Sequence, residues 1–340
     1  MRQTLDFIVI GAQKSGTTSV FEHLRKHPEL YVAPEKDHPF FSHDDVYASG
    51  WSAFMWNAFR GAPTEARWGT VTVPYMMGCP IRGDDEGAGE HDPRERTERI
   101  IPERIHQQLP EVKLIAVLRD PVARCISHYG YDAFLGKADR RRFDETIHEL
   151  LVPATLESSR RQGAPGYVAW GEYGRILKAY YDVFRREQIL VGFTRHLEAS
   201  PREFMRELFA YLGVDPGFVP ADLETRHLRG AGSRRIRWLP DPAQLERRLA
   251  GQRWARALWR SLSTAAQTRA LLLSRRANYR VRLWNAGGSA FSREEASTET
   301  LDLLRAHYEK DRVLLEELIG KPVPWGTRAT APMPFGPPAS

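Results

Sequence analysis

A short segment close to the start of the sequence combines one cationic side chain with several hydroxyl groups. Its residues, in order, are Gly11, Ala12, Gln13, Lys14, Ser15, Gly16, Thr17 and Thr18. An apolar run at residues 5–10 precedes it and a helical pattern follows it, so loop amides and a helix N-terminus lie together. Lys14 supplies positive charge, and the hydroxyls supply hydrogen-bond donors. The segment therefore predicts an anion-binding site.

The spacing of its two glycines matches the loop that binds nucleoside triphosphates. That loop reads G-x-x-x-x-G-K-[ST], and Gly11 and Gly16 keep its spacing. However, Thr17 follows the second glycine, and the lysine has moved forward to Lys14. A lysine there cannot reach the β- and γ-phosphates from the start of the helix. The loop is P-loop-like, and a nucleotide or small-molecule kinase is kept as an alternative function.

A second pair of candidate anion-binding residues begins where another apolar run ends. Arg119 directly follows residues 113–118, and Ser127 comes eight residues later on a helix whose first turn suits Pro121. A guanidinium offers a two-pronged donor to phosphate, and the serine hydroxyl adds another donor. In a magnesium-dependent NTPase this strand would end in Asp. The arginine here argues against such an enzyme.

These two elements resemble the phosphate sites of the PAPS-dependent sulfotransferases, especially their bacterial and glycan-modifying branch. PAPS is 3′-phosphoadenosine-5′-phosphosulfate, the sulfuryl donor of that family. The resemblance implies that Lys14 contacts the bridging oxygen and the sulfuryl group, and that Arg119 and Ser127 hold the 3′-phosphate. The residues it implies for the 5′-phosphate are Ser15, Gly16, Thr17 and Thr18.

Residues 35–42 resemble the K-E-x-H-F-F segment of the same branch. There the lysine contacts the sulfuryl group and the glutamate is the proposed base, which implies these roles for Lys36 and Asp37. The Asp37 side chain is one methylene shorter than glutamate, and histidine precedes proline here. The base is therefore open between Asp37 and His38, with Glu35 third. A histidine has an ordinary pKa of about 6.5, which suits a base near neutral pH.

Two further segments resemble the family more weakly. Residues 68–75 lie where relatives carry the acceptor-side element G-E-x-[ST]-P-x-Y, but Thr70 replaces its acid. Residues 227–232 resemble a basic glycine loop over the 3′-phosphate, which implies that Arg229 and Gly230 also contact the donor. The resemblance covers residues 5–230 and 294–325.

Strands that alternate with helices predict an α/β fold, with a central parallel sheet flanked by helices and a P-loop-like phosphosulfate loop. Strands are expected at residues 5–10, 31–33, 113–118 and 189–193. Helices are expected at residues 17–27, 100–109, 121–131, 173–186, 201–212 and 294–318. The stretch 43–96 is rich in Gly, Pro, Trp and acids, and its part at 83–90 predicts an exposed loop.

One sulfotransferase domain is expected over residues 1–325, with helical additions that shape the acceptor pocket. An arginine-rich helical insertion is expected inside it at about 234–285, and a Pro-rich flexible tail at 326–340.

The charge of the chain is concentrated in this insertion. Between Ser233 and Trp284 thirteen arginines face two acids, whereas the whole chain carries a net charge of +6. The remainder is therefore acidic, which argues against a nucleic-acid partner. Residues 242–285 predict a surface helix with solvated arginines, a lid over an anionic acceptor, or a peripheral contact with an anionic membrane.

Cysteine usage and hydropathy argue against a disulfide-rich, a metal-binding or a membrane-spanning protein. Cys79 and Cys125 give neither a disulfide framework nor a metal-ligand spacing, so no metal is expected. No apolar run approaches the roughly 20 residues that span a bilayer, and residues 1–6 show no signal-peptide pattern. A cytoplasmic location is expected, with peripheral membrane contact as an alternative.

The resemblance implies a function and leaves two alternatives. A sulfuryl group would pass from PAPS to a hydroxyl or amine of a small-molecule, glycan or lipid-linked acceptor, with release of 3′,5′-adenosine bisphosphate (PAP) and no metal. The alternatives are the kinase and a non-catalytic protein that binds anions or a membrane surface.

Overall fold

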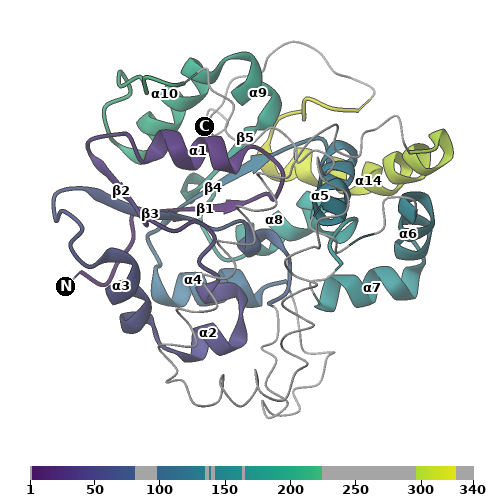
Figure 1. Cartoon of the computed structure of the whole chain (residues 1–340), viewed down its shortest axis with the longest axis horizontal. Helices are drawn as coiled ribbons and strands as arrows, with labels where there is room; N and C mark the ends of the chain where they lie inside the picture. The colour runs from purple at the N-terminus through teal and green to yellow at the C-terminus, as the bar shows by residue number, and fades with distance from the viewer. Residues whose placement is uncertain are drawn as a thin grey trace, which may run out of the picture. The chain divides into compact units, whose positions relative to one another are not determined.

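The computed structural model describes most of the chain, and Figure 1 shows its helices and strands. The described residues are 2–80, 98–134, 138, 142–162, 165–223 and 296–326. Two compact units are found: residues 1–128, 144–228 and 296–340 form the first, and residues 129–143 and 229–295 form the second. Of the second unit, the described part is limited to residues 129–134, 138, 142 and 143. The predicted single domain, the insertion at 234–285 and the tail at 326–340 stay predictions, because 224–295 and 327–340 lie outside the described residues.

Five parallel strands form one sheet in the order β2-β3-β1-β4-β5. The strands are β1 (Phe7–Gly11), β2 (Leu30–Val32), β3 (Arg67–Val71), β4 (Lys113–Leu118) and β5 (Ile189–Phe193). Every residue of β1 and β5 is buried, as expected for parallel strands covered on both faces. The predicted α/β fold with a central parallel sheet is confirmed.

Alternate residues of β1 pack into two separate cores, one on each face of the sheet. Phe7 and Val9 lie in the same apolar cluster as Phe21 and Phe204. Ile8 and Ile10 point the other way and belong to a cluster that includes Leu177. Since successive side chains of a strand leave opposite faces, one short apolar run supplies both cores.

Helices cover both faces of the sheet (Figure 1). The first face carries α1 (Thr17–Leu24), α9 (Thr194–Ala199) and α10 (Pro201–Leu212). The second face carries α3 (Trp51–Phe59), α4 (Ile100–Gln108), α8 (Tyr173–Tyr181) and α14 (Thr298–Ile319). The other helices in the described part of the chain are α2 (Asp44–Ala48), α5 (Pro121–Phe134), α6 (Phe143–Leu150) and α7 (Pro153–Gln162). Short 3₁₀ turns are η1 (Phe40–Ser42), η2 (Val73–Met76), η5 (Ala169–Gly171) and η6 (Arg186–Gln188). Among the described helices, none combines the length and apolar character that crossing a membrane requires.

Two differences from the sequence prediction have local causes. The strand β3 was not predicted, because Gly69 and Thr70 interrupt its apolar pattern. Gly69 is required there, since the Phe7 ring fills the space that a Cβ atom would take. The helix predicted over 173–186 ends at Tyr181 instead. Arg185 has extended backbone dihedral angles, and a separate turn, η6, leads into β5.

Candidate active site

All five strands end at the same edge of the sheet, where the segments with candidate functional side chains begin. Lys14 follows β1, Asp37 follows β2 and Arg119 follows β4. The strand β1 lies between β3 and β4, and the chain leaves β1 toward β2 but leaves β4 toward β5. Such a reversal between neighbouring strands creates the crevice in which open α/β sheets bind their ligands.

The Lys14 loop turns sharply before α1. Lys14 and Gly16 both have positive φ angles, 65° and 87°. Ser15 and Thr17 are buried, while Lys14 and Thr18 are half-buried. The helix α1 begins at Thr17 without a side-chain cap on its first amides. Uncapped amides of this kind, beside a lysine, are the donors that a phosphate or sulfate group uses at a helix N-terminus.

Gly16 is needed at its position for two reasons. Its φ angle of 87° is unfavourable for residues with a Cβ atom. A Cβ atom there would also lie 3.1 Å from Cδ2 of Leu197, in α9. The loop therefore packs directly against α9.

The end of β5 and the end of β4 both hold the Lys14 loop through its carbonyl groups. The Thr194 hydroxyl lies 2.8 Å from the Ser15 carbonyl oxygen and 3.1 Å from that of Leu118. Arg119 donates from Nη1 to the Lys14 carbonyl oxygen at 3.2 Å. The two anion-binding elements predicted from sequence are thus in direct contact. Thr194 was missed, although it follows a buried strand directly, as Arg119 does.

The helix α5, which carries Ser127, is fixed at its start and at its centre. Asp120 caps it by accepting from the Ala123 amide at 2.7 Å. Arg124 is fully buried; it donates to the carbonyl oxygens of Gly166, at 3.2 Å, and Tyr167, and its Nη1 lies 3.3 Å from His128 Nδ1. Ser127 is half-buried in the second turn. No local sequence pattern marks Arg124 as a buried residue.

The acceptor-side candidates Lys36, Asp37 and His38 lie in the segment that follows β2, and this segment is hydrogen-bonded to the end of β3. Asp37 has a φ angle of 65°, and its amide donates to the Val71 carbonyl oxygen at 2.8 Å. Its Oδ1 accepts from the Val73 amide at 3.1 Å, and its Oδ2 lies 3.4 Å from Lys36 Nζ. The Asp37 side chain is 40% exposed. The structure therefore joins Lys36 and Asp37 as an ion pair that remains accessible.

His38 lies in a more apolar environment than Asp37. Its ring meets the Phe54 ring edge-on at 5.5 Å, and its carbonyl oxygen accepts from the Tyr75 hydroxyl at 2.9 Å. Burial lowers the pKa of His38, although the nearby carboxylates of Glu35 and Asp37 oppose the effect. The imidazole is therefore neutral around pH 7.

The remaining candidates are less informative. The hydroxyls of Thr70 and Thr72 lie 3.2 Å apart and are buried, so this segment supplies no second carboxylate. Arg229 and Gly230 lie outside the described residues. Within the parts of the chain that are described, no group of three or more His, Cys, Asp or Glu side chains has the arrangement of a metal site.

A family model for the sulfotransferase domain matches residues 4–228, which include β1 to β5 and the Lys14 loop. The chain belongs to the sulfotransferase family. The family membership confirms the resemblance seen in the sequence, while the roles of single residues stay predictions.

Among the relatives of this chain are heparan sulfate sulfotransferases. The mouse (Mus musculus) heparan sulfate glucosamine 3-O-sulfotransferase 5 is 25% identical over 224 residues, which are 66% of this chain and 57% of the relative. The mouse 3-O-sulfotransferase 3B1 is 30% identical over 213 residues, which are 63% of this chain and 47% of the relative. The chain thus spans about half the length of these curated relatives.

A solved sulfotransferase structure has the same fold. The enzyme from Alicyclobacillus acidocaldarius matches with a TM-score of 0.58 and 20% identity, over 94% of this chain and 97% of that structure. At this identity the likeness concerns the fold alone. The bacterial character and the cytoplasmic location of this chain stay predictions.

Proposed function

We propose that this protein transfers the sulfuryl group of PAPS to a hydroxyl group of a glycan. The observation that carries the proposal is the bond from Arg119 to the Lys14 carbonyl oxygen, which joins two anion-binding elements at the carboxyl ends of β1 and β4. A ligand with phosphate groups at two positions, as in PAPS, suits such a paired site. Heparan sulfate relatives support a glycan acceptor.

The donor roles follow from the contacts around the Lys14 loop. The uncapped amides of α1 and the buried Ser15 hydroxyl, which has no hydrogen-bond partner, suit the 5′-phosphosulfate. Arg119 and Ser127 suit the 3′-phosphate, because a guanidinium fork and a helix hydroxyl present several donors to one anion. In the reaction, the acceptor oxygen bonds to sulfur while the bond from sulfur to the bridging phosphate oxygen breaks. Lys14 stabilises the negative charge on that departing oxygen.

We assign the base that takes the acceptor proton to Asp37. Its carboxylate is exposed, and the Val73 amide holds Oδ1 so that Oδ2 faces the Lys36 ammonium. A loosely bonded transition state asks for a modest base, because little proton transfer is needed before the sulfur–oxygen bond to the donor breaks. The ring of His38 packs against Phe54 instead. In this arrangement the Lys36 ammonium lies beside the sulfuryl group while it passes from PAPS to the acceptor.

Two other expectations from the sequence are a kinase activity and a contact with a membrane. Family membership argues against the kinase. The membrane contact predicted for residues 242–285 stays a proposal for a separate test, namely vesicle flotation of chains with and without that segment.

Transfer of ³⁵S from labelled PAPS to heparan sulfate tests the proposal. Lys14→Ala should abolish transfer, because the departing oxygen loses its cation, and Lys178→Ala should not, because Lys178 pairs with Asp182 on the surface of α8. PAP should raise the melting temperature of the wild-type chain, and Mg-ATP should not. Protection by Mg-ATP without protection by PAP would overturn the proposal.

A further inference from the structure

Tyr173 places a hydroxyl group directly behind the proposed donor site. It is the first residue of α8, and its side chain is 1% exposed. Its hydroxyl lies beside the Ser15 hydroxyl and beside the Arg119 backbone amide. Tyr173 thus meets both the loop that follows β1 and the end of β4.

The two neighbouring hydroxyls are not satisfied. Neither Tyr173 nor Ser15 forms a side-chain hydrogen bond of good geometry, although both are buried. Buried hydroxyls of this kind cost free energy unless something completes their hydrogen bonds. A bound anion at the Lys14 loop would supply the missing acceptor for Ser15.

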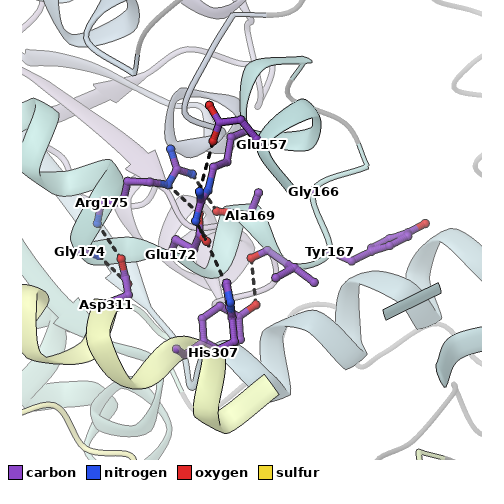
Figure 2. A network of polar contacts seen from close by, with 12 residues as sticks. Glu157, Gly166, Tyr167, Ala169, Glu172, Gly174, Arg175, His307 and Asp311 are labelled. Carbon is purple, nitrogen blue, oxygen red and sulfur yellow. Dashed lines mark hydrogen bonds and ion pairs between the residues drawn. The ribbon is translucent and has the colours of Figure 1, made fainter. Parts of the chain in front are cut away.

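Contacts with helix α14 hold the backbone next to Tyr173. Asp311 in α14 accepts from the amides of Gly174 and Arg175, both at 2.8 Å, and so caps the start of α8 (Figure 2). Beside it, Glu172 is bonded to Arg175 and His307. These contacts hold the start of α8, and with it the Tyr173 backbone, against α14.

The protonation state of the Tyr173 hydroxyl suits a hydrogen-bond donor. Burial raises the pKa of Tyr173 to about 12, although the charge of Arg124 and the contacts with Ser15 and Arg119 oppose the increase. The hydroxyl hence keeps its proton throughout the neutral range.

We propose that Tyr173 is a positioning residue of the donor site: when the donor binds, its hydroxyl accepts from the Arg119 amide and donates to the Ser15 oxygen. The Ser15 proton is then directed at the 5′-phosphosulfate, while the end of β4 keeps the spacing that the 3′-phosphate needs. No covalent step is involved. The inference rests on the proposed function, because it assumes PAPS as the donor.

Tyr173→Phe tests the role, because it removes the hydroxyl and keeps the ring. The affinity for PAP, measured by titration calorimetry, should fall by up to about tenfold, as expected when a hydrogen bond that orients the Ser15 hydroxyl is lost. The KM for PAPS should rise similarly, with a smaller change in kcat. The melting temperature of the ligand-free chain should stay equal or rise, since the Tyr173 hydroxyl is buried there without a hydrogen-bond partner. Unchanged PAP affinity would overturn the inference.

Two further variants separate this role from a structural one. Tyr180→Phe is the matched control on the same helix: its hydroxyl donates to the Tyr75 carbonyl oxygen at 2.6 Å, so it should lower the melting temperature and leave PAP affinity unchanged. Ser15→Ala should lose affinity as Tyr173→Phe does, and the double variant should lose no more than either. Fully additive losses would contradict the inference. A wild-type chain that does not bind PAP would contradict the proposed function instead.

Discussion

Arg160 donates two hydrogen bonds to the buried carboxylate of Glu172, from Nη2 to Oε1 at 2.6 Å and from Nε to Oε2 at 2.9 Å. Arg175 Nε lies 2.7 Å from Oε2, and His307 Nε2 lies 3.0 Å from Oε1 (Figure 2). Burial alone would raise the pKa of Glu172, but the bonds from His307 and Arg160 and the charges of Arg175 and Arg160 lower it to about 2. One carboxylate therefore joins α7, α8 and α14.

The stability of the fold should depend on this carboxylate at acid pH. The pKa of Glu172 falls from an ordinary 4.5 to about 2 on folding, so its contribution is complete above pH 4.5 and is lost as the pH falls toward 2. The difference corresponds to about 3 kcal/mol. Glu172→Gln should lower the free energy of unfolding at pH 7 by about 3 kcal/mol and flatten its dependence on pH below 4.5, as measured by urea denaturation.

Glu157→Gln is the control for that change. Glu157 also contacts Arg160, at 3.3 Å, but its side chain is 45% exposed, so the variant should lose less than about 1 kcal/mol. Equal losses from the two variants would show that the buried network has no special contribution.

The turn at Gly16 should be required for donor binding and not merely for stability. Gly16→Ala places a Cβ atom on a φ angle of 87° and 3.1 Å from Leu197, so the loop must move. Gly213→Ala provides the matched strain, because Gly213 has a φ angle of 75° with nothing near its Cβ position. Each should cost about 1 kcal/mol of stability, but the Gly16 variant alone should lose PAP binding by calorimetry. Equal PAP affinities would contradict the role of the loop.

The sequence was sufficient for four of the five described strands and for the place of the Lys14 and Arg119 segments after two of them. Strands such as 113–118 and 189–193 are continuous apolar runs bounded by polar residues, and their observed limits agree with those predicted. The hydrogen bond between Arg119 and the Lys14 carbonyl oxygen was not predicted, because it depends on β1 and β4 being neighbours in the sheet.

Other parts of the site depend on tertiary structure. The strand β3 needs Gly69 because of the Phe7 ring, which is distant in sequence. Tyr173 reaches Ser15 only because α8 packs on the second face of the sheet, and no local pattern marks it. Asp37 and His38 are adjacent, yet one is exposed and the other packs on Phe54, so composition could not separate them.

Arg119 should distinguish ligands by their 3′-phosphate. Arg119→Lys keeps the positive charge but loses the guanidinium fork and the bond to the Lys14 carbonyl oxygen. PAP affinity should fall about 10- to 100-fold, while the much weaker affinity for 5′-AMP should change little. Arg185→Lys is the control, since Arg185 pairs with Glu111 on the surface. A uniform loss for PAP and 5′-AMP would place Arg119 away from the 3′-phosphate.

Asp37 and His38 should separate in their effects on kcat and on its pH dependence. Asp37→Asn keeps an oxygen for the Val73 amide but removes the base, so kcat should fall at least about 100-fold. His38→Gln should lower kcat by less than about tenfold, because the ring serves packing against Phe54. Since burial lowers the pKa of His38, a histidine base would give a loss of activity as the pH falls below about 6.5, which should be absent in the wild type. A loss of activity in that range that disappears in His38→Gln would instead make His38 the base.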